Sequence, residues 1–254
     1  MADGTQLDVL GVPVTDMTMD EALALMEGII RSPDRHARSI FFVNAHTLNV
    51  AWEDAEYRTL LGRADHVFGD GTGVRWAVRA LHGQRIRDNV NGTDLVPLLF
   101  ATRAHRGYRY YLLGNTEERI GRAAAYAERT FSGWEQVGHH HGYLDGMDQA
   151  EVVETINASN ADMLLVAMGN PKQEQWIDRW KSELRVPLCM GIGGLFDYWS
   201  GDLTRAPAWM RKVGYEWAHL LMRQPHKARR YLVGNPQFLL RVAQARVLGA
   251  GGEA

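Results

Sequence analysis

The chain has 254 residues, of which 46% are hydrophobic and 23% are charged, and this composition is typical of a globular protein large enough to bury a core. It excludes a disordered chain, a collagen and a small protein held together by disulfides. The formal net charge of −2 argues against an indiscriminate nucleic-acid binder.

The near-neutral total hides an uneven distribution of charge. Residues 205–246 contain nine basic residues and one acidic residue, Glu216, so this segment carries +8. Residues 1–204 contain 19 basic and 28 acidic residues and carry −9. An acidic body is therefore followed by a basic C-terminal tail, defined here as residues 204–254.

Cysteine content and the absence of targeting signals indicate the compartment. The single cysteine, Cys189, lies in the apolar run 186–190, and we expect it to be a small core residue in a reducing environment. Residues 1–6 have neither the basic nor the apolar region of a signal peptide. No stretch approaches the run of about 18 apolar residues that a membrane span needs. These features predict a cytoplasmic protein without a membrane-crossing helix.

Short apolar runs alternate along the chain with longer segments of helical period. In chain order, we expect a helix over Thr18–Arg31, a strand over Ser39–Val43, a helix over Asp54–Arg63, a strand over His66–Phe68, helices over Gly73–Leu81 and Thr93–His105, a strand over Arg109–Leu113, a helix over Thr116–Phe131, a strand over Trp134–Val137, a helix over Gln149–Ser159, a strand over Met163–Met168, a helix over Pro171–Leu184 and a strand over Leu188–Ile192. This alternation predicts an α/β fold with a mainly parallel sheet covered by helices on both faces. We expect residues 1–203 to form one α/β domain and residues 204–254 a helical appendage.

A glycine-rich turn over Phe68–Gly73 joins a predicted strand to a predicted helix. Its glycines allow the backbone to approach a ligand closely, and helix-start amides can bind a phosphate. Val74 replaces the third glycine of the dinucleotide fingerprint, and no Gly-Lys-Ser/Thr of a P-loop follows. Asp70, between Gly69 and Gly71, has two interpretations of equal weight: a general base, or a carboxylate that caps the helix or tightens the turn.

Two further segments lie at predicted strand ends. In Gly169–Trp176, Pro171 suits a helix start, Lys172 and free amides suit a diphosphate, and Gln173 suits a sugar or a base, although the spacing alone favours a well-capped amphipathic helix. In Gly191–Tyr198, successive glycines again permit close backbone approach. The strand ends Leu113–Asn115 and Met168–Asn170 are alike, and such turns line the ligand crevice of an open parallel sheet.

Metal-dependent and covalent chemistry have little support in the sequence. The side chains of the consecutive residues His139–His141 cannot converge on one ion from regular structure, so a strand-end or loop cluster is the better interpretation. No serine nucleophile elbow is present, and Cys189 is expected to be buried. We therefore predict neither a metal site nor a cofactor.

The basic tail mixes its charges with aromatic and aliphatic residues at helical spacing. This pattern suits a helix on an anionic bilayer surface or a cationic lid over a phosphorylated substrate. Nucleic acid is the rival partner. A packed helix with a solvated basic face would explain the spacing but not the excess of basic residues.

Motifs throughout the chain resemble those of the bacterial WecG/TagA/CpsF glycosyltransferases. In family order they are Val43–His46, Gly69–Gly71, Asn91–Leu95, Tyr111–Gly114, His141–Tyr143, Gly169–Glu174, Gly193–Asp197, Arg205–Met210, Glu216–Trp217 and Gly234–Pro236. The resemblance implies a Rossmann-like fold and a metal-independent, inverting transfer from a UDP-sugar to a saccharide on polyprenyl diphosphate, in cell-surface polysaccharide synthesis. It also implies a tail that meets the cytoplasmic face of the membrane.

The resemblance implies roles for particular residues. Asp70 is the expected general base, Asn44 positions substrate, Gln173 contacts the nucleotide sugar, and Lys227 and Arg230 complete the site over the diphosphate. The full set of residues expected to contact substrate is Asn44, Gly71, Thr72, Asn91, Asp94, Gly114, Asn115, Asn170, Lys172, Gln173, Gly194, Arg223, Lys227 and Arg230.

Three positions depart from the family pattern. Phe42 stands where family members often have Thr, and Asn89 and Leu220 stand where they often have Arg. These departures leave the donor sugar open among N-acetylmannosamine, its uronic acid and glucose, and they point to Arg85, Arg87 or Arg223 as alternative diphosphate ligands.

Two other functions stay open on the residues alone. One is a nicotinamide-dependent enzyme, which needs a third glycine or a matched ribose-binding acid. The other is a non-catalytic module in which the tail binds anionic lipid. The acceptor, the polymer and the choice between monomer and homo-oligomer are not fixed by the sequence.

Overall fold

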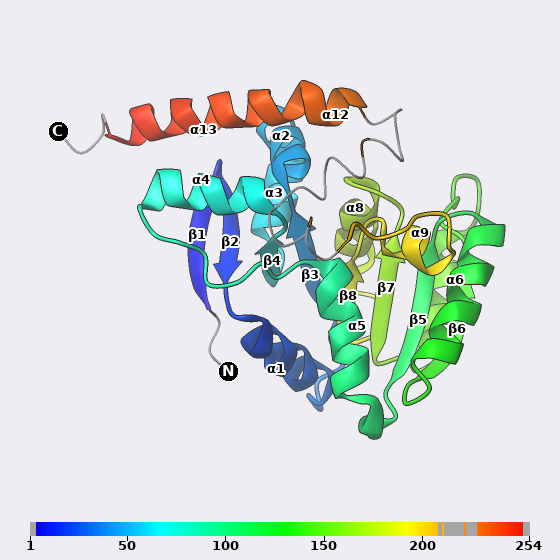
Figure 1. Ribbon diagram of the computed structural model, residues 1–254. Coiled ribbons are helices and arrows are strands. Elements are labelled where there is room, and N and C mark those ends of the chain that lie inside the picture. Colours follow the sequence, from blue (N-terminus) through cyan, green and yellow to red (C-terminus); the bar gives the residue numbers. More distant parts are fainter. Residues whose placement is uncertain (1–3, 208–209, 211–220, 222–227, 251–254) are drawn as a thin grey trace.

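The computed structural model describes residues 4–207, 210, 221 and 228–250 (Figure 1). Its centre is a six-stranded sheet in the order β4-β3-β8-β7-β5-β6, in which every neighbouring pair is parallel. The strands are β3 (Arg38–Val43), β4 (His66–Gly69), β5 (Arg109–Gly114), β6 (Glu135–His140), β7 (Met163–Ala167) and β8 (Leu188–Gly191). The predicted parallel α/β fold is confirmed.

Continuous apolar sequence produces these strands because both faces of the sheet are covered. All five residues of β7 and all four of β8 are buried, whereas the edge strand β6 is only half-buried. Cys189 is fully buried on β8, and burial raises the pKa of its thiol to about 12. Its interpretation as a core residue is confirmed.

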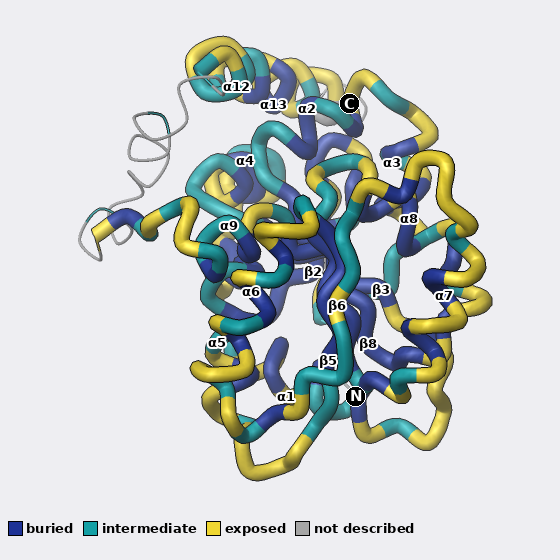
Figure 2. Tube along the Cα trace, turned by 90° about the vertical axis from the view of Figure 1, so that its right-hand side faces the viewer, coloured by how far each residue is buried: buried dark blue, intermediate teal, exposed yellow. Residues whose placement is uncertain are grey.

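Helices cover both faces of the sheet and bury two hydrophobic clusters against it (Figure 2). On one face lie α1 (Met19–Ile30), α5 (Gly92–Thr102), α6 (Glu117–Thr130) and α9 (Leu195–Trp199). On the other lie α2 (Ala45–Glu53), α3 (Ala55–Gly62), α4 (Thr72–His82), α7 (Gln149–Ala158) and α8 (Lys172–Trp180). The predicted capping box of α1 is present: Thr18 Oγ1 accepts from the Glu21 amide, and the Glu21 carboxylate accepts from the Thr18 amide.

Two strands and two helices were not predicted from the sequence. A β-hairpin of β1 (Thr5–Val9) and β2 (Val12–Asp16) packs beside β4, and Thr15 Oγ1 of this hairpin accepts from the Val67 amide. The helices α2 and α9 follow almost directly on β3 and β8. Both helices begin at the sheet edge where the strands end, so they bear on the functional site.

The C-terminal part of the tail that the structure describes, residues 228–250, is mostly helical, as predicted. It contains α12 (Ala228–Leu232) and α13 (Gly234–Ala250), which lies across α2 and α4 (Figure 1). Phe238 and Val242 of α13 are buried in the same cluster as the hairpin, α2 and α4. Within the described residues, no helix combines the length and the apolar character that crossing a membrane requires.

Candidate active site

Asn44 and Asp70 lie side by side at the carboxyl edge of the sheet. Strands β3 and β4 pair in parallel with Val43 opposite Gly69, and the Asp70 amide donates to the Val43 carbonyl at 2.8 Å. The residue after each strand therefore leaves the sheet at the same point. Ligands of open α/β sheets bind at this edge, which favours a functional role for both side chains.

The turn that follows Asp70 is supported from a neighbouring loop. Gly71, at φ +92°, is the N-cap residue of α4, so Asp70 does not occupy the capping position. The Gly71 amide donates to Asn89 Oδ1 at 2.8 Å. Thr72 begins the eleven-residue helix α4, whose first amides face the sheet edge. A half-buried carboxylate thus stands beside a helix N-terminus that can bind an anion.

Asn44 joins this edge to the tail. Its Oδ1 caps α2 by accepting from the amides of His46 and Thr47 at 3.1 and 3.2 Å. The same oxygen accepts from the Arg230 guanidinium of α12 at 3.2 Å. A basic tail residue thereby reaches the predicted site, whereas Arg223 and Lys227 lie outside the described residues.

A buried polar cluster underlies the centre of the edge. Glu174 Oε1 accepts from Asn170 Nδ2 at 2.6 Å and from Gln173 Nε2 at 2.7 Å, and its Oε2 accepts from the Tyr57 hydroxyl at 3.2 Å. Gln173 Oε1 in turn accepts from the Gly193 amide at 3.1 Å. Through these bonds the first turn of α8 holds the glycine loop that follows β8.

Glu174 is the carboxyl group of this cluster. Its side chain is fully buried, and burial raises the pKa of the carboxyl to about 7 despite the hydrogen bonds it accepts from Gln173, Asn170 and Tyr57. Gln173 is also buried, and both ends of its carboxamide are engaged in this cluster. Its contact with the nucleotide sugar stays a prediction. Lys172, one residue earlier, is exposed.

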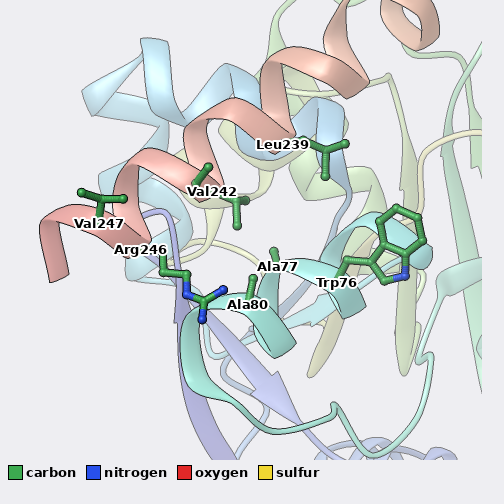
Figure 3. Close-up of a pocket in the computed structure, with 8 residues that line it drawn as sticks. Trp76, Ala77, Ala80, Leu239, Val242, Arg246 and Val247 are labelled. Carbon is green, nitrogen blue, oxygen red and sulfur yellow. The ribbon is translucent and has the colours of Figure 1, made fainter. Parts of the chain in front are cut away.

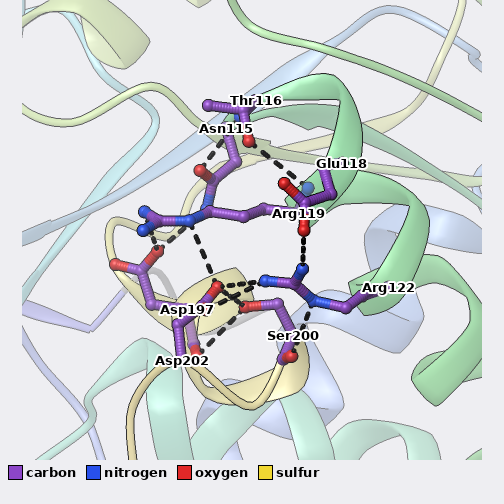
Figure 4. A network of polar contacts seen from close by, with 8 residues as sticks. All are labelled: Asn115, Thr116, Glu118, Arg119, Arg122, Asp197, Ser200 and Asp202. Atoms are coloured by element: carbon purple, nitrogen blue, oxygen red, sulfur yellow. Dashed lines mark hydrogen bonds and ion pairs between the residues drawn. The ribbon is translucent and has the colours of Figure 1, made fainter.

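The ends of β5 and β8 are joined by a second polar network (Figure 4). Asn115, at φ +59°, donates from Nδ2 to Asp197 Oδ1 of α9 at 2.9 Å. Arg119 of α6 lies 3.8 Å from Asp197 and 3.2 Å from Asp202. These contacts fix the loop containing Gly194, which precedes α9. Asp197 was not among the predicted site residues, although its motif Gly193–Asp197 was recognised.

Gly114 is required by the close approach of β5 to β7. Its φ is +137°, and a Cβ at this position would lie 2.2 Å from the Ala167 carbonyl oxygen. The Asn115 amide donates to that same oxygen at 2.9 Å. Gly114 therefore shapes the strand end, whether or not it also touches a ligand.

Asn91 and Asp94 form the start of α5. Asn91 is buried and caps the helix, since its Oδ1 accepts from the Asp94 amide at 2.9 Å. Asp94 forms an ion pair with Arg205 at 2.8 Å. The first basic residue of the tail is therefore engaged by the α/β body.

The departures from the family pattern have structural counterparts. Phe42 is buried against Phe68, and a Cβ on Gly92 would lie 3.1 Å from its ring. Asn89 supports the Gly71 amide, as described above. Arg87 pairs with Glu21 at 2.7 Å, and Arg85 is exposed. Leu220 lies outside the described residues.

The structure collects most of the predicted residues along one sheet edge in two groups. The first contains Asn44, Asp70, Gly71, Thr72 and Arg230, and the second contains Gly114, Asn115, Asn170, Gln173 and Gly194. They meet where β3 pairs with β8, with Phe41 opposite Gly191. The rings of His140 and His141 lie 4.4 Å apart, tilted by 46°, at the end of β6. The described residues contain no group of three or more metal-binding side chains.

The fold and this edge define an α/β protein of the class that binds ligands at the carboxyl ends of parallel strands. Residues 7–251 match the model of the Glycosyl transferase WecG/TagA/CpsF family. The chain therefore belongs to this family of glycosyltransferases. Membership confirms the resemblance and selects glycosyl transfer over the nicotinamide-dependent and non-catalytic alternatives.

Curated relatives cover almost the same span. An N-acetylglucosaminyldiphosphoundecaprenol N-acetyl-beta-D-mannosaminyltransferase of Staphylococcus aureus strain MRSA252 is 30% identical over 243 residues, and the counterpart from strain MW2 is 29% identical. Each alignment covers 95% of this chain and 93% of the relative.

Proposed function

We propose that the protein is an inverting, metal-independent glycosyltransferase that moves a sugar from a UDP-sugar to a saccharide on polyprenyl diphosphate. The observation that carries the proposal is the meeting of Asp70, Asn44 and Arg230 beside the start of α4. A carboxylate, a carboxamide and a guanidinium at one sheet edge supply a base, a positioning group and a positive charge. Family membership supplies the reaction class.

Asp70 is the general base of the proposed reaction. The acceptor hydroxyl oxygen attacks the anomeric carbon, its proton passes to the Asp70 carboxylate, and the bond from that carbon to the UDP oxygen breaks. The electron pair leaves with UDP. A single displacement of this kind inverts the anomeric centre, and a β-linked product from an α-linked donor requires such inversion.

Positive charge for the departing diphosphate comes from the protein. The N-terminal amides of α4 face the edge, and Arg230 approaches it from α12. Lys227 and Arg223 are proposed to add to this charge. Amides and guanidinium groups together can replace the charge that a divalent ion would provide.

N-acetylmannosamine is the first donor sugar to test, because it is the sugar in the names of the relatives. For the acceptor, those names specify N-acetylglucosamine on diphosphoundecaprenol. A lipid-linked acceptor resides in a membrane, so we propose that the enzyme works as a peripheral protein at the cytoplasmic face. The exposed apolar residues of α12 and α13, such as Leu232 and Leu248, suit that location.

The proposal is tested by incubating purified protein with a panel of UDP-sugars and a polyprenyl-diphosphate N-acetylglucosamine mimic, with and without a metal chelator. We expect turnover with one donor, unaffected by chelation, and a β-linked product by NMR. Asp70→Asn is expected to lower kcat by about 10²-fold or more. Asp148→Asn, at the exposed N-cap of α7, is the matched control and keeps full activity because Asn also caps helices well.

Two results would contradict parts of the proposal. Undiminished kcat in Asp70→Asn removes Asp70 from the role of base. Loss of turnover on chelation, restored by Mg²⁺, removes metal independence and leaves the transfer itself standing.

A further inference from the structure

An apolar groove runs between α4 and α13 (Figure 3). Its volume is about 520 Å³, within the range of small-molecule sites. Trp76, Ala77 and Ala80 line it from α4, and Val242, Ala243 and Val247 are among the residues that line it from α13. We propose that this groove binds the first isoprene units of the lipid-linked acceptor; this rests on the proposed function and adds a binding site for the lipid chain.

The groove and the proposed catalytic turn share helix α4. Its first residue, Thr72, follows the Asp70–Gly71 turn, and Trp76 lies one helical turn further along. At the near end, a Cβ on Gly73 would lie 3.6 Å from the Phe238 ring of α13 and 3.4 Å from Ala45, the first residue of α2. From Thr72 to Ala80 the helix rises by about 12 Å. The groove therefore begins just beyond this contact, at Trp76, and a chain leaving the site would reach it by passing along the outer side of α4.

The order of chemical groups along this path matches the order in the acceptor. The saccharide hydroxyl belongs at Asp70, and the diphosphate belongs at the α4 N-terminus and Arg230, which provide positive charge. The isoprenoid chain follows the diphosphate, as the groove follows these groups. At the far end the exposed Arg246 extends from α13 toward Ala80 of α4, and so closes the apolar lining with a charged group (Figure 3).

Large apolar side chains of the groove are exposed, whereas Ala77 and Val242 at its floor are buried. Trp76 is 60% exposed and Val247 is 72% exposed, although both are large apolar side chains beside a buried core. An exposed aromatic at the mouth of an apolar groove favours a ligand with apolar surface. Leu240 of α13 is also exposed, at 66%, but does not line the groove, and so provides a control on the same helix.

The test measures binding of farnesyl diphosphate and isopentenyl diphosphate by calorimetry, without membrane or detergent. The two probes have the same head group, with three isoprene units and one. We expect the full-length protein to bind farnesyl diphosphate at least about tenfold more tightly, a difference of about 1.4 kcal/mol. Ala243→Phe, which fills the groove from an exposed helix position, is expected to remove this advantage. Leu240→Phe is expected to keep it.

A second variant keeps the test decisive if Ala243→Phe fails to fold. Trp76→Ala removes one wall at an exposed position and is expected to reduce the advantage of farnesyl diphosphate at least threefold, with unchanged isopentenyl diphosphate affinity and melting temperature. Equal affinity of the wild type for both probes overturns the proposal, as does an advantage that Ala243→Phe and Trp76→Ala both retain. The titrations are repeated with anionic phospholipid vesicles, and an advantage that arises only in their presence also overturns the proposal, since the surface then contacts the bilayer. Sugar transfer is assayed separately with an acceptor lacking isoprene, so failure of the transferase activity is distinguished from failure of the groove.

Discussion

Replacement of Glu174 by Gln is expected to change how the stability of the protein depends on pH. The fully buried carboxyl has its pKa raised by burial from 4.5 to about 7. Its protonated form is therefore favoured in the folded protein. The resulting stabilisation is fully present below pH 4.5, the unfolded value, and is lost as the pH rises through about 7.

The magnitude follows from the size of this pKa change. At about 1.36 kcal/mol per pKa unit, the contribution of Glu174 falls by about 3 kcal/mol across this window. The introduced carboxamide would mimic the protonated acid: its carbonyl oxygen can accept from Asn170 and Gln173, and its amide can donate to the Tyr57 hydroxyl. We therefore expect Glu174→Gln to gain about 3 kcal/mol relative to wild type between pH 4.5 and 8.

Urea unfolding at a series of pH values measures this difference, because the variant and the wild type share all other titrating groups. Glu53→Gln is a control with the opposite sign. Hydrogen bonding to Arg241 lowers the pKa of Glu53, so its contribution is present above the unfolded pKa and is lost as the pH falls through the folded one. A difference between Glu174→Gln and wild type that stays constant from pH 4.5 to 8 would refute the reasoning.

Three other substitutions test the strand ends and the tail. Gly114→Ala is expected to lower the free energy of unfolding, measured with urea, by more than about 2 kcal/mol, because the new Cβ would overlap the Ala167 carbonyl oxygen. A loss below about 0.5 kcal/mol would count against this close approach. Asn89→Ala removes the acceptor of the Gly71 amide, and we expect it to lower the free energy of unfolding by about 1 kcal/mol and to lower kcat. Asn89→Asp keeps an acceptor and is expected to retain both stability and kcat. Equal effects of the two variants would show that this hydrogen bond has no role. Arg241→Met leaves the Asn49 and Glu53 acceptors without their donor. We expect it to lower the free energy of unfolding by about 1–3 kcal/mol and to speed amide hydrogen exchange in α13. Unchanged exchange would show that this arginine does not hold the helix in place.

Local sequence patterns were sufficient to predict most of the α/β core. Strands such as β7 are buried on both faces, so their sequences are continuously apolar, and the Thr18–Glu21 spacing marks the start of α1 by its own hydrogen bonds. The β1–β2 hairpin lacks such a signal. Its turn has Leu10 at φ +58°, a conformation that favours Asn or Gly, and tertiary burial of Leu10 offsets that cost.

Helix α2 was missed for a different reason. It begins two residues after β3, at Ala45, and its N-cap Asn44 was interpreted only as a site residue. The structure gives Asn44 both roles, since one oxygen caps α2 and accepts from Arg230. A side chain that caps a helix can therefore also belong to the candidate site, and Asn44 should have been considered for both roles.

The candidate site could be located from the sequence at the level of the sheet edge, but not at the level of contacts. Parallel strands place their carboxyl ends together, so the turns at Asp70, Asn115 and Asn170 were expected to meet. The Asn115–Asp197 and Asn44–Arg230 bonds join residues 82 and 186 positions apart. Spacing carries no information about such pairs, which depend on how α9 and α12 pack.

Several basic residues of the tail form contacts with the α/β body of the same molecule. Arg205 pairs with Asp94, Arg230 donates to Asn44, and Arg241 is buried against Glu53 and Asn49. Phe238 and Val242 complete the hydrophobic cluster over α2 and α4. A truncation after Leu203 would expose that cluster, so loss of activity in the truncated chain would not separate a role in membrane binding from a role in folding. Point substitutions such as Arg230→Gln separate the two, because Arg230 is half-buried on a short helix and contacts the site through one hydrogen bond to Asn44.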